Sequence, residues 1–113
     1  MLQTAEVPLI DEEELARAME ALGEERLVPI LQTFAATVMD EAWEIASAVS
    51  GREPERARRL AHAIKGAACN LCATRLARAA EVLETQNLDA DALALLLATA
   101  RETGDWIARR YPD

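Results

Sequence analysis

Residues 24–50 read EERLVPILQTFAATVMDEAWEIASAVS and carry one repeating pattern over their whole length. Apolar residues recur at steps of three and four, the spacing that places side chains on one face of an α-helix. This face comprises Leu27, Leu31, Phe34, Val38, Ala42, Ile45 and Val49. We therefore expect one long amphipathic helix from about Glu24 to Ser50, in which Pro29 is tolerated only near the first turn.

A shorter helix is expected to precede this one. Asp11 can cap it, because an aspartate side chain accepts hydrogen bonds from the first turn of a helix. Acids occupy positions 12–14, where the helix dipole favours negative charge, and Gly23 provides a stop. The buried face of this helix is predicted to carry Leu15, Met19 and Leu22.

A third helix is expected after a break at residues 50–52. Residues 53–55, Glu-Pro-Glu, suit its first turn, since a proline there loses no hydrogen bond. Its apolar stripe comprises Ala57, Leu60, Ala61, Ile64, Ala67, Ala68 and Leu71. Residues 70–72 are predicted to end it.

The C-terminal part of the chain predicts two more helices. The fourth helix is expected from about Ala73 to Thr85, with a turn at residues 86–89. The last is expected from about Ala90 to Arg109, and Gly104 weakens its middle. Its inward residues are predicted to be Leu93, Leu96, Leu97, Ala100 and Ile107.

Five amphipathic helices joined by short turns predict an all-α fold, an antiparallel four-helix bundle with a short additional N-terminal helix. Abundant alanine and leucine and few aromatic residues, 4% of the chain, agree with closely packed helices. A chain of 113 residues is near the usual size of one domain, so residues 1–113 are expected to form a single domain. One apolar stripe per helix can be buried within a monomer, which we therefore expect.

Charge and composition exclude several classes of function. The formal net charge of −8 repels nucleic acid and anionic lipid surfaces. No apolar run reaches the ~20 residues that a membrane span needs, and the N-terminus lacks the features of a signal peptide. Two cysteines do not suggest a disulfide scaffold. We therefore expect a cytoplasmic protein that binds neither nucleic acid nor membrane.

Position 62 carries the only histidine of the chain. At about 100° per residue it lies about 160° from the centre of the third helix's apolar stripe, so it is predicted to face water. Its face is shared by Glu55, Arg58, Arg59, Lys65, Gly66 and Cys69. The three cations on this face, Arg58, Arg59 and Lys65, disfavour protonation of the ring to its charged form and would attract a phosphoryl group. The alternative is an ordinary surface histidine beside incidental charges.

Residues 61–71, AHAIKGAACNL, followed by Leu76, Leu83 and Glu84, resemble the signature of the histidine-containing phosphotransfer (HPt) family. In that signature the histidine is followed by any residue, a large aliphatic residue, lysine, glycine and small residues, and then by a leucine-rich helix that ends in Leu-Glu. The family usually has glycine ten residues after the histidine, where this chain has Cys72. We expect Asn70 to take the left-handed conformation instead, because asparagine tolerates it better than most residues.

The resemblance implies a stand-alone histidine phosphotransferase of a phosphorelay. His62 would accept a phosphoryl group from the phospho-aspartate of a receiver domain and pass it to another response-regulator receiver, with Lys65 close to the transferred group. The residues expected to contact the partner are Gly66, Arg58, Arg59 and Cys69. A hybrid histidine kinase would be a further partner, and the receiver would supply Mg²⁺, so the chain needs no cofactor of its own. No autokinase or ATPase activity is expected.

Three other interpretations stay open. One is a helical interaction module that binds a signalling partner without chemistry. Another concerns Cys69 and Cys72, whose C-x-x-C spacing also occurs in zinc and redox sites, although packing is the default role of such residues. The third concerns a flank of the second helix, which we expect the first or last helix to cover rather than a docked receiver. This flank comprises Gln32, Ala36, Met39 and Trp43.

Overall fold

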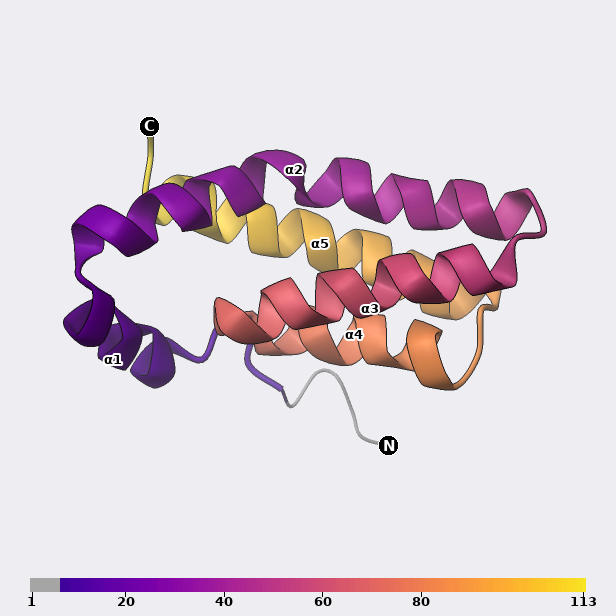
Figure 1. The fold of residues 1–113 in the computed structure, drawn as a ribbon, viewed down its shortest axis with the longest axis horizontal. Coiled ribbons are helices and arrows are strands. Elements are labelled where there is room, and N and C mark those ends of the chain that lie inside the picture. Colours follow the sequence, from indigo (N-terminus) through magenta and orange to yellow (C-terminus); the bar gives the residue numbers. More distant parts are fainter. Residues whose placement is uncertain (1–6) are drawn as a thin grey trace.

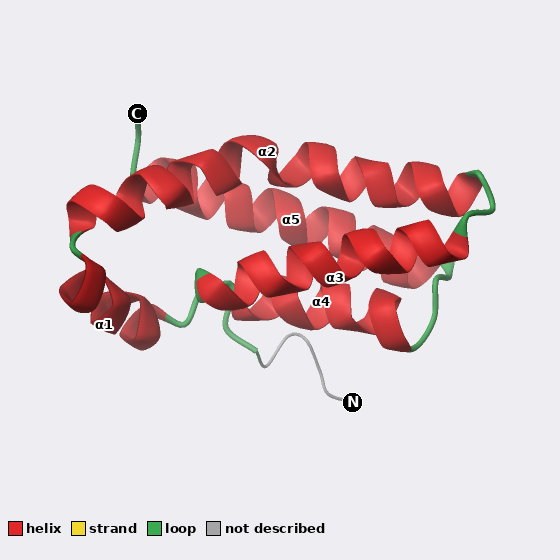
Figure 2. Ribbon diagram, viewed as in Figure 1, coloured by secondary structure: helices red, strands yellow, loops and turns green. Residues whose placement is uncertain are grey.

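The computed structural model describes residues 7–113, which form five α-helices and no strand (Figure 1, Figure 2). The helices are α1 (Glu12–Leu22), α2 (Glu24–Ser50), α3 (Pro54–Asn70), α4 (Thr74–Thr85) and α5 (Ala90–Arg110). Each bound lies within one residue of the one expected from periodicity and capping. The predicted all-α class is confirmed.

The four longer helices run along the long axis of the molecule (Figure 1). Helix α2 packs against α3 and α5, and α4 packs against the same two helices. Helix α1 packs on α2 and lies at the end of the molecule where α2 begins (Figure 1). The backbone N–H of Asp11 also donates to the carbonyl of Cys72 at 2.8 Å, which ties the start of α1 to the turn between α3 and α4.

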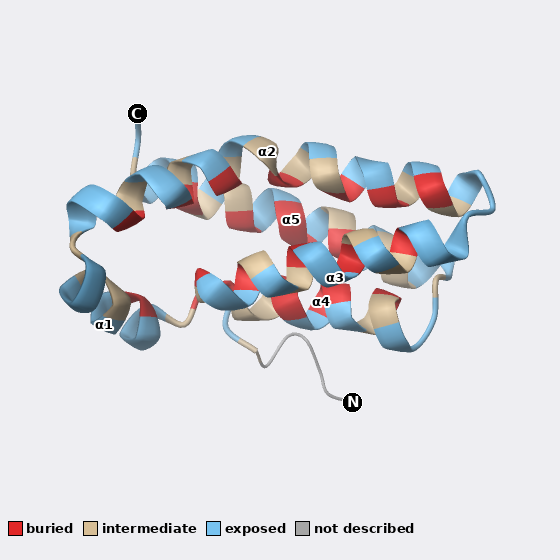
Figure 3. Cartoon of the chain, viewed as in Figure 1, coloured by how far each residue is buried: buried red, intermediate tan, exposed pale blue. Residues whose placement is uncertain are grey.

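The core is built from the inward faces of all five helices (Figure 3). The predicted face of α2 is buried except at Val49, which is half-buried because the neighbouring Ala48 takes the inward position. Pro29 lies inside α2 as its sixth residue rather than in its first turn, which corrects the expectation. A proline there has no N–H to donate to the carbonyl of Glu25, so the helix lacks one hydrogen bond at this point.

Helix α1 begins and ends as predicted. The side chain of Asp11 accepts from the backbone N–H of Glu14 at 3.1 Å, and Gly23 follows the helix with a φ of 89°. Leu15 is buried, but Leu22 is 50% exposed, so its predicted inward position is wrong. The reason is that α1 packs closely on α2 alone, with an exposed ion pair from Glu12 to Arg110 of α5, and these contacts do not cover its whole apolar face.

The turn between α3 and α4 corrects a second expectation. Asn70 stays within α3, and Cys72 itself takes the left-handed conformation, with a φ of 64°. The N–H of Ala73 donates to the carbonyl of Ala68 at 2.8 Å, and the N–H of Cys72 donates to that of Cys69 at 3.2 Å. These two bonds form a Schellman motif, in which the left-handed residue is the fifth of the six residues that the longer bond encloses. The motif therefore requires the left-handed conformation at residue 72 and not at residue 70.

Helix α5 packs closely on α2. Leu96, Ala100 and Ile107 are buried as predicted, whereas Leu93 and Leu97 are half-buried at the edge of the core. A Cβ atom added at Gly104 would lie 3.4 Å from Cγ1 of Val38. Gly104 therefore faces α2 at a point of close approach, a role that its position in the sequence did not reveal.

The flank of α2 is covered only in part. The side-chain amide of Gln32 donates to the carbonyl of Tyr111 at 3.1 Å, and Met39 packs partly buried against the core. Trp43 is 54% exposed and Ala36 is exposed too, so the expected cover is wrong at these two residues. Trp43 lies in the second half of α2, whereas α1 lies beside its start (Figure 1). No helix formed by residues 7–113 is long and apolar enough to cross a membrane.

Candidate functional site

His62 lies on the outer face of α3, and 68% of its side-chain surface is exposed. Its neighbours Ala61 and Ile64 are buried, which fixes the rotation of the helix about its axis. The predicted exposure of His62 is therefore confirmed. The reason is the one used for the prediction: the apolar stripe points into the core and carries the histidine to the opposite side.

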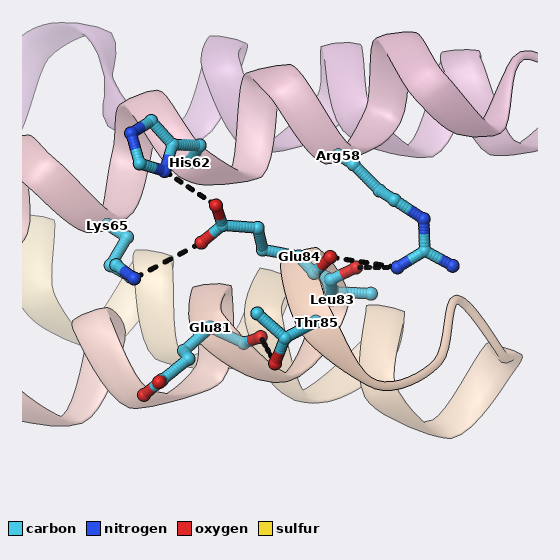
Figure 4. A network of polar contacts seen from close by, with 7 residues as sticks. All are labelled: Arg58, His62, Lys65, Glu81, Leu83, Glu84 and Thr85. Carbon is cyan, nitrogen blue, oxygen red and sulfur yellow. Dashed lines mark hydrogen bonds and ion pairs between the residues drawn. The ribbon is translucent and has the colours of Figure 1, made fainter.

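The imidazole of His62 contacts a carboxylate on the neighbouring helix (Figure 4). Nδ1 of His62 lies 2.6 Å from Oε2 of Glu84, which belongs to the last turn of α4. Twenty-two residues separate the two in sequence, and the packing of α3 against α4 brings them together. The immediate charged neighbour of the histidine is thus an acid.

Lys65 joins the same carboxylate from the next turn of α3. Its Nζ lies 3.2 Å from Oε1 of Glu84, and Figure 4 shows the carboxyl group between the lysine and the histidine. Oε1 is shielded from solvent, and the contact with Lys65 is the one that balances its charge. Burial of the carboxyl raises the pKa of Glu84, but its contacts with His62 and Lys65 outweigh burial and lower this pKa below its ordinary value.

These contacts determine which nitrogen of the neutral ring carries the proton. A distance of 2.6 Å between Nδ1 and a carboxylate oxygen requires one hydrogen between them. Because Glu84 is ionised at neutral pH it only accepts, so the hydrogen belongs to Nδ1 of His62. The other nitrogen, Nε2, then keeps its lone pair. In Figure 4 it points away from Glu84.

Arg58, one turn before the histidine on α3, reaches the end of α4 (Figure 4). Its Nη1 donates to the backbone carbonyls of Leu83 at 3.2 Å and Glu84 at 2.9 Å. The last carbonyls of a helix have no partner within it and carry partial negative charge, so a guanidinium stabilises this helix end. The same contact holds the backbone of Glu84 in place beside His62.

His62 lines one side of an open pocket, and the other lining residues are Arg58, Arg59 and Glu84. Arg59 and Cys69 are exposed, as their places on the wheel predicted. A Cβ atom added at Gly66 would meet nothing within 4 Å, so the surface beyond this glycine is open. The described structure holds no partner, and contact of these residues with one stays a prediction.

A comparison with family models adds independent evidence. The model of the Hpt domain, the histidine-containing phosphotransfer domain, matches residues 29–106, which is more than half of the chain. The chain belongs to the Hpt domain family. Hpt domains act in phosphorelays, together with response-regulator receivers and histidine kinases. Searches of curated proteins and of solved structures give no match to this Hpt chain.

The environment predicted for the histidine of this Hpt chain was incomplete. The sequence predicted three cations around His62, but it did not predict that Glu84 contacts the ring. The reason is that a helical wheel relates residues of one helix, whereas Glu84 comes from the next helix. The available signal was the Leu-Glu ending of the signature, at Leu83 and Glu84, which identified the residue without giving it a role.

The two cysteines of the Hpt chain are free thiols. Cys69 is exposed and Cys72 is half-buried, at the end of α3 away from the histidine site. Within residues 7–113, no three side chains of histidine, cysteine, aspartate or glutamate are placed to hold a metal ion together. The C-x-x-C spacing thus has no further ligand nearby in the described structure.

Proposed function

We propose that His62 is the phosphoryl acceptor and donor of this Hpt domain, taking the group from a receiver's phospho-aspartate and passing it to another response regulator. The observation that carries the proposal is the exposed ring whose Nδ1 is held by Glu84 and whose Nε2 faces outward (Figure 4). A nucleophile needs an available lone pair that a partner protein can approach. Nε2 of His62 has both properties.

The proposed step is an in-line displacement. The lone pair of Nε2 attacks the phosphorus atom of the aspartyl phosphate, and a P–N bond forms while the P–O bond to the aspartate breaks. The receiver keeps the free carboxylate, and the ring gains positive charge that the carboxylate of Glu84 can stabilise through Nδ1–H. Transfer to the next receiver is the reverse of this step.

The other requirements of the transfer are met partly by this chain and partly by the receiver domain. Lys65 lies on the same carboxylate as the histidine and can turn its ammonium group toward the arriving phosphoryl group. Mg²⁺ and the acidic pocket that phosphoryl transfer requires would come from the receiver domain. The chain then needs to supply only a positioned nucleophile, without kinase or ATPase activity of its own.

The proposed platform is an antiparallel four-helix bundle of α2 to α5, to which α1 is added. The pairwise packing of α2 with α3, α3 with α4, α4 with α5 and α5 with α2 supports it. We further propose that residues 1–113 act as one monomeric domain in the cytoplasm. Gly66, with open space beyond it, together with Arg58, Arg59 and Cys69, would lie against the receiver.

The test is phosphoryl uptake from a phosphorylated receiver in the presence of Mg²⁺. The parent chain is expected to take up label that is lost in acid and kept in base, as a phosphohistidine is. His62→Gln is expected to take up none, while its helical circular dichroism spectrum and its thermal midpoint match those of the parent. Equal labelling of parent and variant would overturn the assignment, and an unlabelled parent that still binds the receiver would identify a non-catalytic interaction module.

A further inference from the structure

The turn that ends α3 brings its two cysteines together. The N–H of Cys72 donates to the carbonyl of Cys69 at 3.2 Å. Between them Asn70 is helical, and Leu71 has a φ of −104° and a ψ of 13°. The values of Leu71 match the second central position of a type I turn, and a helical residue such as Asn70 fits the first; the end residues of such a turn have Cα atoms within about 7 Å of each other. A disulfide needs a Cα separation of roughly 4.4–6.8 Å, so the backbone of this turn suits one.

The two thiols also share the same surface. Cys69 and Cys72 line one pocket, together with Asp11, Glu14, Thr74 and Ala77. Cys69 is exposed and Cys72 is half-buried, so a small reagent reaches Cys69 more readily than Cys72. Neither thiol takes part in the chemical step proposed for His62, although Cys69 belongs to the surface proposed to face the receiver.

We propose that Cys69 and Cys72 are a redox-active dithiol that closes reversibly to a disulfide by exchange with a low-molecular-weight disulfide such as oxidised glutathione. This modification site does not depend on the proposed function of His62. It requires no large movement, because the turn already holds the two residues at the ends of one hydrogen-bonded loop.

The order of the two exchange steps follows from the surroundings of the thiols. Burial raises the pKa of Cys72, and the charges of Asp11 and Glu14 raise it further, so its thiolate is scarce at neutral pH. The exposed Cys69 therefore attacks first as its thiolate, forming a mixed disulfide with one glutathionyl group and releasing one glutathione thiolate. Cys72 then loses its proton and attacks the sulfur of Cys69, which releases the second glutathione.

The disulfide would stabilise the turn that connects α3, the helix of His62, to α4 and to the start of α1. The carbonyl of Cys72 accepts from Asp11 at the start of α1, and the N–H of Ala73, which opens α4, donates back to α3. Closing a loop within this turn restricts the unfolded chain more than the folded one. The oxidised protein is therefore expected to unfold a few degrees above the reduced protein.

The experiment equilibrates the complete chain in glutathione buffers of increasing oxidation and identifies the products by mass spectrometry of unreduced peptides. We expect a monomer that has lost two hydrogen atoms, with Cys69 linked to Cys72, and full reversal by dithiothreitol. Cys72→Ser is the matched control and is expected to stop at a glutathione adduct on Cys69. Stable glutathione adducts or disulfide-linked dimers of the parent would overturn the proposal, as would thiols that stay reduced or a disulfide that lowers the thermal midpoint.

Discussion

At the scale of single residues, the contact between Glu84 and His62 determines which ring nitrogen of the proposed phosphoryl acceptor carries the proton. Without the carboxylate, a neutral imidazole in water divides its proton between both nitrogens. Glu84→Ala is therefore expected to raise the fraction of ring with hydrogen on Nε2, and to slow phosphoryl uptake by on the order of tenfold or more. Nitrogen chemical shifts of His62 measure the first effect, and labelling rates measure the second.

Glu84→Gln is the matched control for this experiment. The amide oxygen of glutamine can still accept from Nδ1 of His62, so the protonation pattern of the ring is expected to stay as in the parent. The charge is lost, so the ion pair with Lys65 is lost too. An Nε2–H fraction that does not change in Glu84→Ala would remove Glu84 from the role of positioning residue.

Lys65 provides the second prediction at this scale. Lys65→Ala is expected to slow transfer by about tenfold to a hundredfold, because it removes a cation from beside the developing charge. Stability should change by less than about 1 kcal/mol, since partly exposed ion pairs contribute little to folding. Lys65→Arg, which keeps the charge, should retain more activity than Lys65→Ala. Full-speed transfer by Lys65→Ala would exclude the lysine from the site.

The lowered pKa of Glu84 predicts how stability depends on pH. Its folded-state pKa lies below its unfolded value of about 4.3, so its charged contacts stabilise the fold above that pH. This contribution is lost as the pH falls from about 4.3 through the folded pKa. The parent is therefore expected to lose stability relative to Glu84→Gln over that range, as measured by denaturant unfolding. Parallel stability curves would show that the contacts do not depend on the charge of Glu84.

At the scale of helices and turns, two helix ends use a left-handed residue other than glycine. Arg52 after α2 has a φ of 60°, and Cys72 after α3 has a φ of 64°. At both ends a six-residue closure surrounds the left-handed residue: Glu53 donates to Ala48 in the first and Ala73 to Ala68 in the second. Residues with a Cβ atom take this conformation at a cost of roughly 1–2 kcal/mol.

Cys72→Gly is therefore expected to stabilise the protein. The strain that glycine removes is larger than the free-energy cost of the extra conformational entropy that glycine gives the unfolded chain. The free energy of unfolding should therefore rise by about 0.5–1 kcal/mol. Denaturant unfolding under reducing conditions measures it. Cys72→Ala keeps the strain and loses the contacts of the thiol, so it should be no more stable than the parent. A gain in Cys72→Ala as large as in Cys72→Gly would assign the effect to the thiol and not to the backbone.

The helices could be predicted from the sequence because their signals are local. Asp11 and Asp89 cap α1 and α5 through their own side chains, and the apolar period fixed the outward direction of His62. The left-handed residue at Cys72 was missed because hydrogen bonds to the preceding turns select it, and not the preference of Asn70. Glu84 was missed as a partner of His62 because the register of α4 against α3 comes from packing between helices.

At the scale of the whole molecule, the spacing of α2 and α5 depends on Gly104. A Cβ atom there would lie 3.4 Å from Cγ1 of Val38 and 3.5 Å from the carbonyl oxygen of Ala35, which is ordinary contact. A methyl group therefore fits, but a longer side chain has no room unless the helices move apart. Glycine also costs a helix about 0.5–1 kcal/mol relative to alanine.

Two substitutions of opposite sign follow from this packing. Gly104→Ala is expected to stabilise the protein by up to about 1 kcal/mol, because it gains helix propensity at no steric cost. Gly104→Leu is expected to destabilise it by about 1–3 kcal/mol, because the larger side chain overpacks the contact with Val38. Chemical denaturation of both variants measures the difference. Phosphoryl uptake should persist in both variants as long as they are folded, since His62 lies on α3 against α4. If Gly104→Leu were as stable as Gly104→Ala, α2 and α5 could separate freely and the packing argument would be wrong.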